Sequence, residues 1–289
     1  MANPAGRRSC LSVPGSSESM IRKALQSAAH EVVIDLEDAV APDHKPGARD
    51  TVVRLLSAGG HGEKWISVRV NAAGTPWSHE DLAALGSLPH LPHSVVLPKV
   101  ESAGDVAYAD RLLAGAGHGR TAPPIRIQAL IESAAGLQNL GEIARASDRL
   151  EALVLGYADL GADLGRSPGS DFWGPARDHL LWAARAQGLL AIDGPWLDVA
   201  DDTAFQQAVA EANGTGFDAK WVIHPRQIDT VNRIFQPTEE DISWALRVVD
   251  ALDQAERTGV GAVQLDGAML DAAVALRARR VLAGTGADA

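Results

Sequence analysis

The sequence predicts a (β/α)8 barrel, and three features support that prediction. Eight short runs rich in Val, Ile and Leu recur along the chain, as is typical of strands that are covered on both faces. Segments with apolar residues at helical spacing separate these runs. No G-x-G-x-x-G sequence follows the first run, so an open, doubly wound sheet is the weaker alternative.

The eight predicted strands are spaced evenly enough to form one closed sheet. They cover residues 9–13, 31–36, 65–70, 94–100, 125–131, 150–156, 188–193 and 220–224. Predicted helices lie between them, over residues 17–29, 46–58, 80–88, 103–116, 134–147, 175–187 and 203–214. We therefore expect the barrel to occupy residues 1–235 as a single domain.

The chain continues beyond the eighth strand for longer than a minimal barrel requires. A helical pattern covers residues 226–256, a Gly-containing break follows, and an Ala- and Arg-rich helix is predicted over residues 271–283. Residues 236–289 are thus expected to form a C-terminal helical extension that packs on the barrel or on a neighbouring subunit.

Composition and charge limit the possible functions. The chain has 289 residues, 46% hydrophobic and 22% charged, which is typical of a globular protein with a sizeable core. Its net charge of −11 argues against a nucleic-acid-binding surface. The single cysteine, Cys10, excludes an internal disulfide and a Cys-based zinc cluster, and we expect it to be buried in the first strand. Neither a signal peptide nor an 18-residue apolar run is evident, so we expect a cytoplasmic protein with no membrane span.

Polar residues stand where the predicted strands end, which is where such barrels carry their reactive groups. They are Glu37, Asp38, Arg69, Asn71, Lys99, Glu101, Glu132, Asp159 and His224. Each acid alone could cap a helix or pair with a surface base. Because buried unpaired carboxylates are costly, Glu132 and Asp159 close together would require a cation or a shared proton. Carboxylates without Cys or a His pair suit Mg²⁺, or Mn²⁺ in its place.

Arg69 ends an apolar run and must be paired if it is buried. Glu37 or Asp38, from the preceding strand, is its expected partner. An arginine held in this way can bind a substrate carboxylate or stabilise an enolate oxygen. The alternative is a purely structural ion pair.

Several motifs together resemble one known family. They include "VVIDLEDAVAPDHKPGAR", "VRVNAAGTPWSHEDLAAL", "VVLPKVES", "WVIHPRQI" and "LDGAMLDAAV", and the likeness covers nearly the whole chain. The chain is similar to the citrate lyase β-subunit-like (CitE-like) family of the HpcH/HpaI aldolase superfamily of CoA-ester lyases. This resemblance implies a TIM barrel that uses Mg²⁺ to cleave or form a C–C bond beside a thioester.

The resemblance also implies roles for individual residues. Glu132 and Asp159 would hold the metal, Arg69 would contact the substrate, and Glu37 and Asp38 would form the acidic pair after the second strand. Asp266 would act in the active site of an adjacent subunit, in a homotrimer or hexamer. Tyr157 and Ala158 stand where many members of the family carry a glutamate before the aspartate, so the resemblance does not determine the identity of the substrate.

The implied reaction converts a 3-hydroxyacyl-CoA of the malyl-, citramalyl- or citryl-CoA type into an acyl-CoA and a 2-oxo acid. Arg8 and Lys23 are the expected partners of the CoA phosphates. Three alternatives remain: a citrate lyase β subunit that acts on citryl-ACP within a complex, a metal-dependent 2-oxo acid aldolase without CoA, and a non-catalytic binding protein.

Overall fold

The sheet is a closed barrel of eight parallel strands. The computed structural model describes residues 6–62, 64–119, 121, 123–167, 172–258 and 263–285. The strands pair in chain order, and β8 closes the barrel against β1. They are β1 (Ser9–Pro14), β2 (Glu31–Asp35), β3 (Trp65–Arg69), β4 (Ser94–Leu97), β5 (Arg126–Ile131), β6 (Leu150–Leu155), β7 (Leu190–Asp193) and β8 (Ala219–Val222). The predicted barrel is confirmed.

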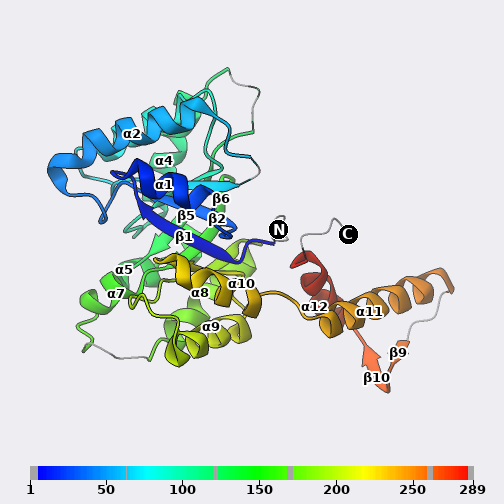
Figure 1. The fold of residues 1–289 in the computed structure, drawn as a ribbon. Coiled ribbons are helices and arrows are strands. Elements are labelled where there is room, and N and C mark those ends of the chain that lie inside the picture. Colours follow the sequence, from blue (N-terminus) through cyan, green and yellow to red (C-terminus); the bar gives the residue numbers. More distant parts are fainter. Residues whose placement is uncertain are drawn as a thin grey trace.

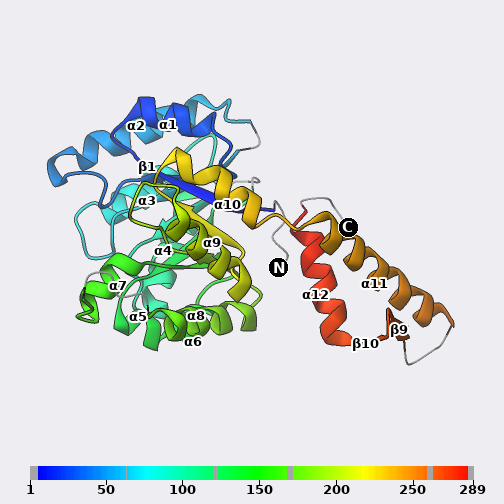
Figure 2. The same ribbon diagram turned by 60° about the horizontal axis from the view of Figure 1, so that its bottom comes forward.

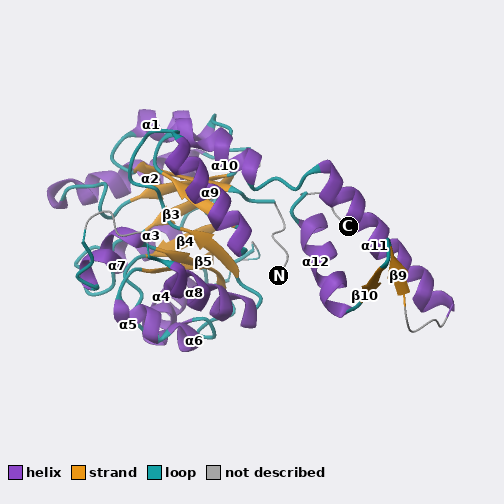
Figure 3. Ribbon diagram, turned by 90° about the horizontal axis from the view of Figure 1, so that it is seen from below, coloured by secondary structure: helices purple, strands orange, loops and turns teal. Residues whose placement is uncertain are grey.

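Helices surround this sheet (Figure 3). They are α1 (Glu18–Leu25), α2 (Lys45–Ala58), α3 (Ser78–Gly86), α4 (Ala103–Ala116), α5 (Ala134–Gln138), α6 (Leu140–Ile143), α7 (Tyr157–Asp163), α8 (Gly174–Ala186), α9 (Thr203–Thr215) and α10 (Ile228–Ile234). A large apolar core joins the outward-facing strand residues to the helices. A separate cluster, made only of strand residues such as Val33, Leu130 and Trp221, fills the barrel interior. Because both faces of the sheet are covered, most residues in its strands are apolar.

A buried polar layer closes the end of the barrel where the strands begin. Glu31 is fully buried and accepts hydrogen bonds from Arg7 at 3.1 Å, from Gln128 at 2.8 Å and from Ser67. Cys10 is buried in the same layer, as expected, and burial together with the Glu31 charge raises the pKa of its thiol well above the usual value. Because the charged groups of this layer are paired with one another, the layer is structural, and the chemistry is expected at the other end.

Two details differ from the sequence prediction. The helix predicted over residues 134–147 is two short helices, α5 and α6, which meet at Asn139. Helix α7 was not predicted, because it has only seven residues and a single buried apolar one, Leu160. Its first turn contains Asp159, so this carboxylate lies in a helix rather than at the end of β6.

The C-terminal extension stands away from the barrel (Figures 1 and 2). It consists of α11 (Glu239–Thr258), a two-stranded hairpin of β9 (Val263–Leu265) and β10 (Ala268–Leu270), and α12 (Ala272–Ala283). The predicted helix over residues 226–256 is interrupted before α11, near Pro237, which lacks an N–H donor. The extension has its own small apolar cluster, which includes Ala245, Val248 and Leu270.

No helix within the described ranges combines the length and apolar character that crossing a bilayer requires.

Candidate active site

Arg69 is held at the mouth of the barrel by three acids. Asp35 is its register partner on β2 and accepts two hydrogen bonds, at 2.8 Å from Nε and at 2.5 Å from Nη2. Nη1 lies 3.0 Å from Glu37 and 3.7 Å from Asp38. The expected pairing with Glu37 and Asp38 is therefore present, but Asp35 makes the bidentate contact. Burial lowers the pKa of Arg69, and the hydrogen bonds and charges of these acids outweigh that effect and raise it.

The sequence prediction gives Asp35 no role at the site, because this residue lies inside an apolar run that is predicted as a strand. Its side chain also accepts the backbone N–H groups of Glu37 at 2.8 Å and Ala39 at 3.0 Å. It thereby fixes both the arginine and the loop that follows β2. Lys45, the first residue of α2, donates to the carbonyls of Leu36 and Glu37 and holds the same loop from its other side. A period-two count from Val33 would have placed Asp35 on the inward face, beside Arg69.

Lys99 links the acidic loop after β2 to Glu132. Its ammonium forms an ion pair with Glu37 and lies 3.6 Å from Asp38. Its backbone N–H donates to Oε1 of Glu132 at 2.7 Å. Lys99 has a φ of 51°, and within the described residues only Asp266 shares a positive φ among non-glycines. Such a strained backbone persists where the surrounding contacts require it, often at functional sites.

Glu132 follows β5 and is 4% exposed. Burial, together with the charges of Glu37 and Asp159, raises the pKa of this carboxyl to about 8, although the Lys99 N–H opposes the shift. The contribution of Asp159 places its charge within electrostatic reach of the Glu132 carboxyl. Gly156, the residue before α7, makes room for Glu132: a Cβ at this position would lie 2.7 Å from Glu132 Cβ and 2.8 Å from Oε2.

The charge balance of this mouth fits a divalent cation. Five carboxylates face three cations, which leaves an excess of two negative charges when all are ionised. The acids are Asp35, Glu37, Asp38, Glu132 and Asp159, and the bases are Arg69, Lys99 and Lys45. Oε2 of Glu37 is buried and accepts no hydrogen bond, although it lies 3.0 Å from Nη1 of Arg69, and burial raises the pKa of this carboxyl. Mg²⁺ would relieve the excess charge through oxygen ligands, the donor type that it prefers.

Two protein carboxylates would leave other positions of such an ion open. Across the parts of the chain that the structure describes, no three His, Cys, Asp or Glu side chains are arranged to hold a metal by themselves. Mg²⁺ commonly keeps waters in the remaining positions, and substrate oxygens can replace them.

Asp266 does not join this cluster within its own chain. It lies in the turn between β9 and β10, with a φ of 52°, and forms an ion pair with Arg247 of α11. Its side chain is 61% exposed. The hairpin belongs to the extension that stands away from the barrel (Figure 1).

The two predicted phosphate partners lie before and after β1 in the chain. Lys23 is exposed in the last turn of α1, the helix that follows β1. Arg8 precedes β1 and donates to the carbonyl of Gly284, at 3.0 Å, at the end of α12. The position of Arg8 does not support a contact with a ligand at the mouth of its own chain. His224 caps a turn by accepting the N–H of Arg226 at 3.2 Å.

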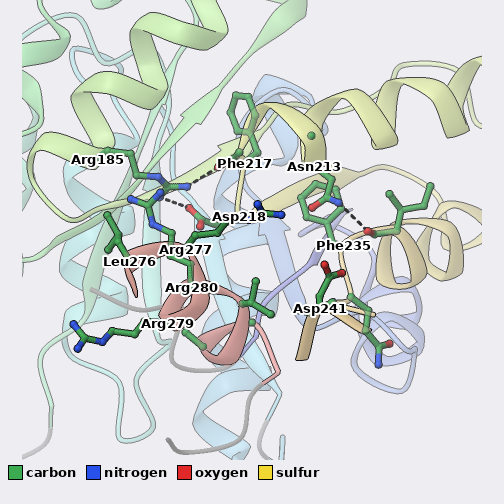
Figure 4. Close-up of a pocket in the computed structure, with 18 of the residues that line it drawn as sticks. Arg185, Asn213, Phe217, Asp218, Phe235, Asp241, Leu276, Arg277, Arg279 and Arg280 are labelled. Carbon is green, nitrogen blue, oxygen red and sulfur yellow. Dashed lines mark hydrogen bonds and ion pairs between the residues drawn. The ribbon is translucent and has the colours of Figure 1, made fainter. Parts of the chain in front are cut away.

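A cavity of about 930 Å³ lies away from the carboxylates, between α12 and the loops that lead into β7 and β8. Figure 4 shows Arg277 and Arg280 on its α12 side, with Arg185 and Phe217 on the barrel side. None of the carboxylates described above lines it. It separates the extension from the barrel floor and does not belong to the candidate site.

Known proteins resemble the chain over almost its whole length. A family model described as HpcH/HpaI aldolase/citrate lyase matches residues 8–225. The L-malyl-CoA/β-methylmalyl-CoA lyase of Cereibacter sphaeroides is 34% identical, over 94% of this chain and 92% of the relative. The (3S)-malyl-CoA thioesterase of the same species is 36% identical, over 96% and 93%. The structure of CitE from Mycobacterium tuberculosis in complex with magnesium, acetoacetate and coenzyme A is 33% identical with a TM-score of 0.76, and the match covers 98% of this chain and 100% of that one.

Proposed function

Since the chain belongs to the HpcH/HpaI aldolase/citrate lyase family and is a carbon–carbon lyase, we propose that its substrate is a 3-hydroxyacyl-CoA of the malyl-, citramalyl- or citryl-CoA type. Reversible cleavage would give an acyl-CoA and a 2-oxo acid. The observation that carries this proposal is the buried carboxyl of Glu132, which feels the charge of Asp159, at a barrel mouth where Asp35 already orients Arg69.

Glu132 and Asp159 are the proposed ligands of Mg²⁺, with Mn²⁺ as a substitute. When bound, the ion would act as a Lewis acid on the hydroxyl or keto oxygen of the substrate. The magnesium in the related CitE complex supports this choice. The raised pKa of Glu132 is a further support, because a carboxyl that resists ionisation in the bare site is one that a neighbouring cation stabilises.

Arg69 is proposed to stabilise the thioester enolate that leaves when the C–C bond breaks. Its guanidinium is 11% exposed and is fixed by Asp35 and Glu37, so little reorganisation is needed as charge develops. Glu37 and Asp38 are assigned to holding Arg69 and Lys99 in place. Lys99 forms ion pairs with both acids, and the proposed mechanism requires no Schiff base from it.

Asp266 is the proposed general acid/base, supplied by a neighbouring copy of the chain. It would move the proton to or from the methyl carbon of the acyl-CoA. Its exposure on a projecting hairpin, remote from its own barrel mouth, supports a role in a second subunit. Lys23 is the proposed contact for the CoA phosphates.

The test is a panel of malyl-, citramalyl- and citryl-CoA, each incubated with Mg²⁺ or EDTA. We expect an acyl-CoA and a 2-oxo acid with Mg²⁺ only, and no reaction by Glu132→Ala. Full activity of that variant would contradict the metal assignment.

Product analysis also separates the competing functions. The thioesterase relative favours a second candidate, hydrolysis of the thioester, which would release free CoA and the intact hydroxy acid. Activity only on citryl-ACP in the presence of partner subunits would identify a citrate lyase β subunit. Cleavage of free 2-oxo acids would identify an aldolase without CoA.

A further inference from the structure

We propose that Tyr157 is a positioning residue: it connects the first turn of α7 to β7 and so fixes the position of Asp159, the second proposed metal ligand. This inference rests on the proposed metal site and adds a residue to it. Tyr157 begins α7, and Asp159 lies in the same turn. The residue before the helix, Gly156, has no side chain that could cap it. A seven-residue helix is marginal by itself, so contacts outside α7 must hold Asp159 in place.

The phenol hydroxyl of Tyr157 occupies one defined place in a chain of charged groups. It donates to Oδ1 of Asp193, whose side chain is fully buried at the end of β7. It also accepts a hydrogen bond from Nε of Arg177 at 2.7 Å. Because Arg177 can only donate and an ionised Asp193 can only accept, the hydroxyl has a single satisfied orientation.

The groups on either side of this hydroxyl are themselves fixed. Lys220 of β8 forms an ion pair with Asp193 and donates to the carbonyl of Gly194 at 2.8 Å. On the other side, Arg177 forms an ion pair with Glu211 of α9 at 2.6 Å. The hydroxyl is therefore anchored to two barrel strands and two outer helices rather than to a mobile loop.

The ring of Tyr157 is confined as well. Trp173 lies on one side, with ring centroids 4.9 Å apart and planes tilted by 60°. Gly194 lies against the ring, and a Cβ there would come within 2.8 Å of Cδ2 and 3.0 Å of Cε2. A side chain fixed at both its ring and its hydroxyl leaves the turn that carries Asp159 little freedom.

A second contact fixes the far end of α7. Asp163 accepts the backbone N–H of Ala134 at 2.7 Å, two residues after Glu132. The helix is thus tied to the β7 side by Tyr157 and to the β5 loop by Asp163. The Tyr157 contact is the one in the turn of Asp159, so its loss should affect metal affinity more than fold.

The direct test is Tyr157→Phe, which removes only the hydroxyl, with Mg²⁺ binding measured by calorimetry in the absence of substrate. Outer groups that orient metal ligands typically contribute 10–100-fold to affinity, so we expect Mg²⁺ to bind about 10-fold more weakly. Tyr108→Phe is the matched control, since it removes the same hydroxyl from the chain's other tyrosine, which is 38% exposed on α4. We expect it to bind Mg²⁺ like the wild type.

Arg177→Lys provides a milder second variant in case Tyr157→Phe does not fold. It keeps the positive charge and removes the Nε donor, so a smaller loss of Mg²⁺ affinity is expected. If the folded variants bind Mg²⁺ as tightly as the wild type, the positioning role of Tyr157 is overturned. A lower melting temperature in these variants would then show that Tyr157 has a structural role only. Wild-type protein that binds no Mg²⁺ would overturn both this inference and the proposed metal site.

Discussion

At the scale of single residues, the carboxylates of the site differ in how well the surrounding protein stabilises their charged form. Asp35 is satisfied by Arg69 and by two backbone N–H groups. Glu132 accepts only the backbone N–H of Lys99 in the described structure, and it is buried beside the charges of Glu37 and Asp159. This difference supports the proposed roles of Asp35 in positioning Arg69 and of Glu132 in binding the metal.

The raised pKa of Glu132 predicts how the metal-free protein responds to pH. Its pKa is about 8 in the folded chain against an ordinary value of 4.5. A raised folded-state pKa means that ionisation costs stability, so this cost begins above pH 4.5 and is complete above about pH 8. In EDTA, the wild type should therefore lose stability relative to Glu132→Gln as the pH rises from 5 to 8. Urea unfolding of both proteins measures this, and parallel pH curves would contradict it.

The left-handed backbone of Lys99 predicts an unusual pair of substitutions. An L-residue with positive φ carries a cost of about 1–2 kcal/mol that glycine avoids. Lys99→Gly and Lys99→Ala both lose the ammonium that pairs with Glu37. We expect the glycine variant to be more stable than the alanine variant by about 1 kcal/mol in urea unfolding, the reverse of the usual order. An alanine variant of equal or greater stability would show that the strain is absent.

At the scale of elements, α7 links the sixth strand to the proposed metal site. Gly156→Ala would place a Cβ 2.7 Å from that of Glu132. Since neither the strand end nor the buried carboxylate can move freely, we expect weaker Mg²⁺ binding and at least a roughly 10-fold loss of activity. Gly161→Ala, in the same helix, is the control, because its nearest contact would be an ordinary 3.5 Å from Trp173. Equal Mg²⁺ affinity in the two variants would refute the steric argument.

The elements that the sequence predicted well are those with a strong periodic pattern. All eight strands were found because runs such as 31–36 and 150–156 are apolar and β-branched or Leu-rich. Helix α7 was missed because one buried leucine in seven residues leaves no period to detect. The β9–β10 hairpin was missed because its turn, Asp266–Gly267, lies within a stretch interpreted only as a break.

The same limit applies within the candidate site. Residues at strand ends, such as Arg69 and Glu132, could be named from their positions alone. The contributions of Asp35 and of the backbone N–H of Lys99 could not be predicted in this way. The first depends on the direction of the Asp35 side chain, and the second on the positive φ of Lys99.

At the scale of the whole molecule, the C-terminal extension exposes several large apolar side chains to solvent in a single chain. Its large side chains Leu246, Met269 and Leu276 are 55%, 64% and 52% exposed. Exposed apolar groups gathered on a small unit are typical of a surface that contacts another protein. The proposed acid/base, Asp266, lies on this unit, so the molecule as a whole is consistent with a site completed by a second copy.

A site shared between copies predicts that two inactive variants restore activity in a mixture. Glu132→Gln lacks the metal ligand, and Asp266→Asn lacks the acid/base, so each alone should have little activity. When the two are unfolded together and refolded in equal amounts, random assembly pairs an intact barrel with an intact hairpin in about a quarter of the sites. Activity near a quarter of the wild-type value is therefore expected in the mixture. A mixture no more active than its two components would show that Asp266 does not act across a subunit boundary.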